Sequence, residues 1–243
     1  MKTLGGVLAA AITPRRPGTQ EIDLGAMWEL FDLLESHHVN GLVLMGSTGE
    51  FPHFSIEERN RMVGLAVRRS RVPVVVNVSH STLDGALLLA RAAASMGAAA
   101  LLLMPPIFFR YTQAELEEFF RLFAASAKFG TPLLLYNIPL FAERIEMETA
   151  ATLLKEGLYS GIKDSSGEMA GIRKLRELTQ GETYTLLAGN DAVFSYAKTL
   201  GANGVISGVA CAVPELLLAL NRARDTGHAA AEQTAVPGEQ RSS

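Results

Sequence analysis

Short runs rich in valine, isoleucine and leucine alternate with longer amphipathic stretches along almost the whole chain. Most of the short runs are apolar at every position rather than at alternate positions. That pattern is typical of strands buried on both faces of a parallel sheet. It predicts strands at 7–13, 41–45, 72–77, 98–104, 132–137, 159–163, 184–188 and 204–207.

The amphipathic stretches predict a helix after each strand, and local signals mark several helix ends. Ser55 stands three residues before Glu58, and Thr112 stands three residues before Glu115, which is the spacing of a capping box. Glycines follow several predicted helix ends, where a left-handed residue is favoured, at Gly97, Gly130, Gly157 and Gly201. The predicted helices lie near 23–38, 55–69, 81–96, 112–128, 146–156, 168–179, 191–200 and 213–224.

Eight strand–helix units in a chain of 243 residues match the count and length of an α/β (β/α)8 TIM barrel. The main alternative is an open doubly wound sheet, which usually carries a G-x-G-x-x-G turn after its first strand. The turn after strand 7–13 reads Pro-Arg-Arg-Pro instead. We therefore expect one barrel domain over residues 1–225. Residues 226–243 have no apolar periodicity, and we expect a disordered C-terminal tail there.

Composition narrows the classes of partner and compartment. Hydrophobic residues make up 48% of the chain, and its formal net charge is -3. This mild acidity gives no reason to expect nucleic acid or an anionic membrane as a partner. No apolar run approaches the roughly 20 residues of a membrane span. The single cysteine, Cys211, cannot form an internal disulfide, so we expect a cytoplasmic protein.

Lys163 is the most informative residue, because chemistry in such barrels takes place at the carboxyl ends of the strands. It is the only one of six lysines that ends a predicted strand. Burial disfavours a charged ammonium, and a neutral amine attacks carbonyl carbon to give a Schiff base. The alternative is a lysine that reaches solvent or pairs with Asp164. Among the tyrosines, Tyr136 alone lies at the end of a buried run.

Strand 41–45 leads into Gly-Ser-Thr-Gly-Glu at residues 46–50. Two glycines around two hydroxyls allow a tight turn that presents N–H and O–H groups together, which suits a carboxylate or a phosphate. The alternative is a simple turn with a local hydrogen bond. The ends of the last two strands, near Gly189 and Ile206, also hold phosphate in many barrels. The five histidines show no metal-ligand spacing, and we expect no metal.

Three segments together resemble one enzyme family. They are residues 46–50, residues 136–139 (Tyr-Asn-Ile-Pro) and residues 161–167 (Gly-Ile-Lys-Asp-Ser-Ser-Gly). In sequence, order and strand position they are similar to the dihydrodipicolinate synthase / N-acetylneuraminate lyase family. Members of this family are class I, Schiff-base aldolases on a (β/α)8 barrel. The resemblance runs from about residue 4 to about residue 225.

The resemblance implies a role for each matching residue. Lys163 would form an imine with pyruvate, or with a 2-oxo acid that yields pyruvate. Tyr136 would move protons, with Ser47 as its relay partner. Ser47 and Thr48 would hold the substrate's carboxylate, and backbone at two further positions, Gly189 and Ile206, would line the pocket. No diffusible cofactor is implied, and the assembly would be a homodimer or homotetramer.

Three departures from the family pattern limit what can be carried over. Phe141 stands where the synthases have an arginine for the aldehyde's carboxylate, and Arg144 lies three residues further on. Phe108 stands where many members have a relay tyrosine, so that Tyr111 or water would complete the relay, or the relay would be shorter. Family members usually continue with C-terminal helices, which we expect this barrel to lack.

The sequence thus predicts a carbon–carbon lyase that cleaves a 2-oxo acid to pyruvate and an aldehyde, or runs the reverse. Sugar-derived 2-keto-3-deoxy acids and 4-hydroxy-2-oxo acids are the expected substrates. Dehydration of a 2-keto-3-deoxy sugar acid through the same imine is an alternative, as is dihydrodipicolinate synthesis. A homologue that binds a 2-oxo acid without turnover and a metal-free phosphosugar isomerase are rivals of other classes.

Overall fold

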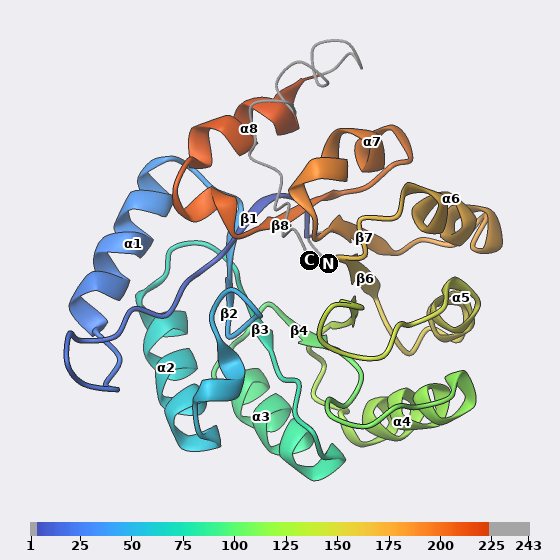
Figure 1. Ribbon diagram of the computed structural model, residues 1–243, viewed down its shortest axis with the longest axis horizontal. Helices are drawn as coiled ribbons and strands as arrows, with labels where there is room; N and C mark the ends of the chain where they lie inside the picture. Colours follow the sequence, from blue (N-terminus) through green and yellow to red (C-terminus); the bar gives the residue numbers. More distant parts are fainter. Residues whose placement is uncertain (1–3, 224–243) are drawn as a thin grey trace.

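A computed structural model describes residues 4–223, which form a closed barrel of eight parallel strands with eight helices outside it (Figure 1). Each strand pairs with the next, and β8 pairs with β1 to close the ring. The predicted (β/α)8 fold is confirmed. The predicted domain boundary at residue 225 and the predicted tail at 226–243 lie outside the described residues.

The strands are short and almost completely buried, which accounts for their continuous apolar runs. Apart from Gly6, every strand residue is buried, with the barrel's filling on one face and the helices on the other. The strands are β1 (Gly6–Ala10), β2 (Gly41–Leu44), β3 (Val74–Asn77), β4 (Ala100–Leu103), β5 (Leu133–Asn137), β6 (Gly161–Asp164), β7 (Thr185–Ala188) and β8 (Gly204–Ser207).

The helices begin and end largely where local signals predicted. Capping boxes join Ser55 to Glu58 and Thr112 to Glu115, and the four predicted glycines have positive φ. The helices are α1 (Leu24–Ser36), α2 (Ile56–Arg69), α3 (Leu83–Ser95), α4 (Gln113–Ser126), α5 (Met147–Lys155), α6 (Met169–Leu178), α7 (Phe194–Thr199) and α8 (Pro214–Arg222). Short 3-10 helices lie at η1 (Phe51–His53), η2 (Asp191–Val193) and η3 (Val209–Cys211).

Two of the differences in extent between predicted and observed elements have a visible cause. The first strand ends at Ala10 rather than at residue 13. By Thr13 the chain contacts the β2–α2 loop, where the Thr13 hydroxyl donates to the Gly49 carbonyl at 2.8 Å. The predicted helix 191–200 is split into η2 and the short α7. Asn190 caps η2 by accepting from the Ala192 amide at 2.9 Å.

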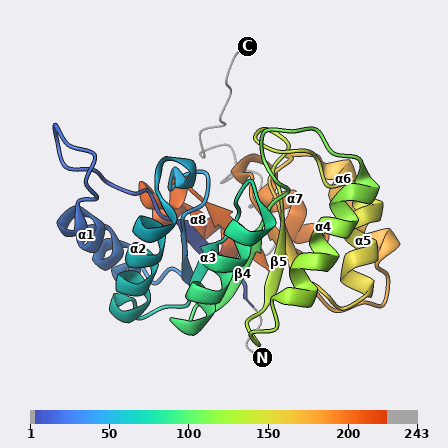
Figure 2. The same cartoon turned by 90° about the horizontal axis from the view of Figure 1, so that it is seen from below.

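The parallel arrangement brings every strand's carboxyl end to the same side of the molecule. From the side, the β2–α2 and β4–α4 loops rise at the upper end of the barrel (Figure 2). This end, the barrel mouth, is where the predicted site residues would meet. Within residues 4–223, every helix is too short or too polar to cross a bilayer.

Candidate active site at the barrel mouth

Tyr136 and Lys163 lie side by side on neighbouring strands. They are register partners in the β5–β6 pair, and both side chains are buried, with Lys163 5% exposed. The Lys163 Nζ lies 4.1 Å from the centroid of the Tyr136 ring. The amine therefore sits against a phenol face rather than in bulk water.

Ser47 joins this pair from the other side of the barrel. Its Oγ lies 3.1 Å from the Tyr136 hydroxyl, so one hydrogen bond links the β2–α2 loop to β5. Thr48 lies against the end of β8. A Cβ added at Gly208, the residue that follows this strand, would lie 3.0 Å from the Thr48 Oγ1. The structure thus brings Lys163, Tyr136 and Ser47 together, with Thr48 beside them.

Because Gly189 has no side chain, the stem of Lys163 can occupy the space beside it. A Cβ added there would lie 2.0 Å from the Ser165 Oγ and 2.7 Å from the Lys163 Cε, so any larger residue would displace the amine. The Ser165 Oγ is buried and has no hydrogen-bond partner among residues 4–223. Ile206 is buried on β8, where it pairs in register with Leu8. Both residues predicted to line the pocket are therefore inside the barrel or at its mouth.

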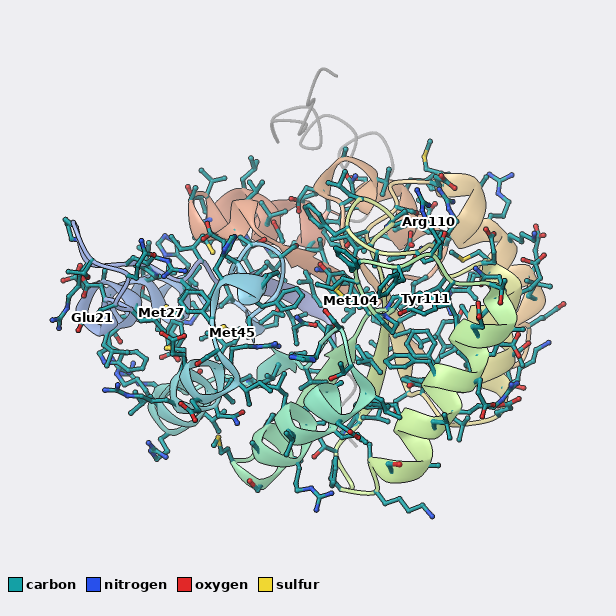
Figure 3. The ribbon with its side chains drawn as sticks, turned by 60° about the horizontal axis from the view of Figure 1, so that its bottom comes forward. Glu21, Met27, Met45, Met104, Arg110 and Tyr111 are labelled. Carbon is teal, nitrogen blue, oxygen red and sulfur yellow. The ribbon has the colours of Figure 1, made fainter. Side chains whose placement is uncertain are left out.

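The turn formed by residues 46–49 is flanked by two left-handed residues that are not glycine. Met45 and Glu50 both have φ of 55°, a conformation that side chains bearing a Cβ rarely adopt. The Glu50 amide donates to the Ser47 carbonyl at 3.0 Å. Figure 3 shows Met45 where β2 leads into this turn. The conformation holds Ser47 and Thr48 at the mouth.

A second layer of polar residues lies behind the Tyr136–Lys163 pair. Successive strand residues point to opposite faces, and Asn137 pairs in register with Asp164. The Asn137 Nδ2 donates to Asp164 Oδ1 at 2.6 Å, and the Ser166 hydroxyl donates to Oδ2 at 2.7 Å. Burial raises the pKa of Asp164, and these hydrogen bonds lower it in part. Both oxygens of the Asp164 carboxylate therefore accept hydrogen bonds from Asn137 and Ser166. The alternative for Lys163, an ion pair with Asp164, would have required one of these oxygens to bond the lysine instead.

The loops after β4 and β5 give the mouth an apolar rim, which we define as Phe108, Phe109, Leu140 and Phe141. Their exposed fractions are 90%, 67%, 70% and 53%. Arg144 is already paired, because its guanidinium forms two hydrogen bonds with the Glu168 carboxylate, at 2.5 and 2.6 Å. In Figure 3, Arg110 and Tyr111 lie on the β4–α4 loop near the start of α4.

Two buried polar residues beneath the 46–49 turn escaped the sequence analysis. Arg59 on α2 is 3% exposed, and Asn77 at the end of β3 is 1% exposed. Helical spacing could have revealed Arg59, since it lies three residues from both Ile56 and Met62 on the apolar face of α2. Within residues 4–223, no cluster of three or more histidine, cysteine or acidic residues could hold a metal ion.

Comparisons of this chain with known proteins agree on one protein family. A profile described as the dihydrodipicolinate synthetase family matches residues 3–236. The 4-hydroxy-tetrahydrodipicolinate synthase of Alkaliphilus oremlandii is 32% identical over 213 residues, which are 86% of this chain and 72% of that protein. A 2-dehydro-3-deoxy-D-gluconate/2-dehydro-3-deoxy-phosphogluconate aldolase of Picrophilus torridus is 30% identical over 188 residues, which are 77% of this chain and 70% of that protein.

Solved structures of enzymes with these activities in their names have the same fold. The 2-keto 3-deoxygluconate aldolase from Picrophilus torridus superposes with a TM-score of 0.88 at 27% identity, covering 95% of this chain and 83% of that one. Dihydrodipicolinate synthase from Aquifex aeolicus superposes with a TM-score of 0.89 at 27% identity, covering 96% and 80%. The fold is therefore shared with solved structures of two kinds of enzyme.

Proposed function

Because this chain belongs to the dihydrodipicolinate synthetase family, we propose that it is a class I, pyruvate-dependent aldolase that works through an imine on Lys163. The observation that carries the proposal is the buried contact of Lys163 with Tyr136, together with the 3.1 Å contact between the Tyr136 hydroxyl and Ser47 Oγ. A nucleophile, a proton carrier and a hydroxyl relay thereby lie within one short path.

The chemistry begins with the Lys163 amine attacking the keto carbon of a 2-oxo acid. Loss of one water from the carbinolamine gives a protonated imine, and Tyr136 carries the protons that this exchange requires. The 46–49 turn binds the substrate's carboxylate through Ser47 and Thr48, which fixes the keto carbon over the amine. Gly189 and Ile206 line the pocket around the new bond.

Cleavage then uses the imine as an electron sink. The substrate's 4-hydroxyl gives its proton to the Tyr136–Ser47 pair, the C3–C4 bond breaks, and its electrons move into the iminium to form an enamine. The aldehyde leaves, C3 takes up a proton, and water hydrolyses the imine to release pyruvate. The reverse sequence of steps joins pyruvate to an aldehyde. All of these steps use side chains of this protein and water.

We further propose sugar-derived 2-keto-3-deoxy acids as the substrate class. The rim where an aldehyde would enter carries Phe108 and Phe141, and Arg144 is held by Glu168. Arg110, the other arginine on the loops after β4 and β5, lies 3.6 Å from Glu143, so both arginines already face a carboxylate of this protein. Relatives named 4-hydroxy-tetrahydrodipicolinate synthase support that synthesis as the second candidate.

Borohydride trapping tests the imine directly. The protein is incubated with pyruvate and sodium borohydride, and its peptides are mapped by mass spectrometry. We expect a reduced pyruvyl adduct on Lys163 in the wild type and none in Lys163→Ala. Lys174→Ala is the matched control, since Lys174 is an exposed lysine on α6 that pairs with Glu148. A folded wild type without adduct would overturn the aldolase proposal.

The two substrate candidates are separated by product analysis. We expect the enzyme to release pyruvate from 2-keto-3-deoxygluconate in an assay coupled to lactate dehydrogenase. Incubation of pyruvate with aspartate semialdehyde should give little condensation product. A faster reaction with aspartate semialdehyde would favour the synthase and contradict the proposed substrate class.

A further inference from the structure

Arg59 is a buried cation whose partners are all uncharged. Its guanidinium donates to the carbonyl oxygens of Asn77 at 2.9 Å and Ser79 at 3.0 Å, and it lies 4.9 Å from the centroid of the Phe51 ring. Among residues 4–223, it takes part in no ion pair. Burial lowers its pKa to about 10. Burying a guanidinium that has no carboxylate partner costs more free energy than burying an apolar side chain of the same size. A gain in stability therefore does not explain why an arginine stands at this position.

The contacts of Arg59 lead to the near end of the 46–49 turn. Asn77, whose carbonyl Arg59 holds, donates from Nδ2 to the Met45 carbonyl at 2.6 Å. The Asn77 side chain is itself oriented by the Ser79 hydroxyl, which donates to its Oδ1 at 2.6 Å. Arg59 therefore fixes the amide that holds Met45, the left-handed residue at which the turn begins.

The same guanidinium also reaches the far end of the turn. Phe51, the ring beneath Arg59, directly follows Glu50, the second left-handed residue, and its amide donates back to the Gly46 carbonyl at 3.4 Å. Unfavourable backbone conformations of this kind persist only where surrounding contacts hold them. One buried side chain thus braces both ends of the segment that carries Ser47 and Thr48.

We propose that Arg59 is a positioning residue that keeps the 46–49 turn in the conformation needed to bind the substrate's carboxylate. The inference rests on the proposed function of that turn. Arg59 does not touch the substrate, and acts through Asn77 and Phe51. Losing it should weaken binding of a 2-oxo acid more than binding of an uncharged carbonyl compound, because only the acid uses the turn's N–H and O–H groups as a carboxylate site.

The test compares the trapping of pyruvate and pyruvamide, its uncharged analogue, on the wild type, Arg59→Lys and Arg61→Lys. Lysine keeps the charge of Arg59 but cannot make the two-pronged contact. Arg61 is the matched control, an exposed arginine on the same helix. In Arg59→Lys we expect trapping efficiency to fall about tenfold with pyruvate and less than about twofold with pyruvamide, since misplaced donors cost mainly the charged ligand. Arg61→Lys should match the wild type with both.

The outcomes distinguish the two proposals. If the wild type gives no adduct with pyruvate, the aldolase proposal fails, and the inference about Arg59, which rests on it, falls with it. If the wild type reacts and Arg59→Lys loses pyruvate and pyruvamide trapping equally, Arg59 has only a structural role and the inference is overturned. Unchanged trapping of both compounds in a folded Arg59→Lys overturns it too.

A second variant covers the case in which Arg59→Lys does not fold. Phe51→Leu removes the ring under the guanidinium but leaves the two carbonyl contacts in place. We expect it to fold, as checked by circular dichroism, and to lower the ratio of pyruvate to pyruvamide trapping in the same direction but by less. A wild-type ratio in folded Phe51→Leu, when Arg59→Lys cannot be obtained, counts against the proposal.

Discussion

The buried site and the exposed rim of the barrel mouth are built in opposite ways. Around Lys163 and Tyr136 the side chains are buried and the approach of Gly189 leaves no room for even one extra carbon atom. On the loops that follow β4 and β5, the rim of Phe108, Phe109, Leu140 and Phe141 is mostly exposed. Among residues 4–223, its one ring contact is the edge-to-face pair of Phe108 and Phe109, whose centroids lie 4.9 Å apart.

This difference separates chemistry from choice of aldehyde. Pyruvate is the part of the reaction that every proposed substrate shares, and the buried site can be built tightly around it. The aldehyde varies, and the rim that would meet it is made of exposed loop residues that can change without disturbing the barrel. Substitutions in the buried site should therefore stop the reaction, whereas substitutions in the rim should redirect it.

The largest effect is expected at Lys163. Lys163→Met removes the amine and keeps an apolar stem of similar length, so kcat/KM for retro-aldol cleavage should fall by more than about 10⁴-fold, as when a covalent nucleophile is removed. The midpoint of thermal unfolding should not fall, because methionine fills a similar volume without burying a polar amine. Retained cleavage in Lys163→Met would place the nucleophile elsewhere.

Tyr136→Phe should be the next most damaging change. The variant keeps the ring against Lys163 and loses the hydroxyl that contacts Ser47, so kcat should fall by about 10²- to 10⁴-fold. Tyr159→Phe is the control, since that buried hydroxyl donates to the Phe120 carbonyl at 3.0 Å, away from Lys163. Tyr159→Phe should lose stability and keep its kcat. Equal losses of kcat in both variants would argue against a proton relay.

Gly189→Ala should have a smaller effect that still exceeds its cost in stability. The added methyl would push on the Lys163 Cε, and misplacing a reacting atom by about 1 Å can cost about 100-fold in rate. Gly171→Ala on α6 is the control, because its new Cβ would lie 3.7 Å from its nearest neighbour. Steady-state kinetics and imine trapping would both report the change. An active Gly189→Ala would mean that the lysine stem can move aside.

The smallest effect should come from the rim. Phe141→Arg introduces a cation at an exposed position, so the preference for aldehydes with a carboxylate should rise by about two- to fivefold, the scale of an exposed ion pair. Measuring kcat/KM for charged and uncharged aldehydes at low and high salt would show it, since salt screens such a contact. A drop for both aldehydes would instead mark Phe141 as part of the packing.

The sequence predicted the barrel because a strand that is buried on both faces is apolar at nearly every position, and this pattern can be seen in the sequence of most strands. It also predicted Lys163 and Tyr136, since each is the only residue of its type at a strand's carboxyl end. Pairing of β5 with β6 then brings Tyr136 and Lys163 together, as the fold rule requires. The barrel and the neighbouring positions of these two residues could be predicted because they depend only on the order of the strands, whereas the catalytic roles of Lys163 and Tyr136 stay predictions.

Features set by tertiary contacts were not predicted. Arg59 follows two glutamates and was not singled out, although its spacing from Ile56 and Met62 puts it on the buried face. The left-handed backbone at Met45 and Glu50 has no local signal, because neither residue type favours it. Such conformations arise where distant segments hold the chain, and a single sequence does not state which segments those are.

The closure of the ring by β1 and β8 has a consequence for synthesis on the ribosome. Gly6 and Gly204 meet at this seam so closely that a Cβ on Gly204 would lie 2.1 Å from the Gly6 carbonyl oxygen. Until residue 204 has left the exit tunnel, β1 has no partner on that side and stays an open edge that other chains could pair with. A chain stalled before that point would be an aggregation hazard, whereas one released just after it could close its own edge.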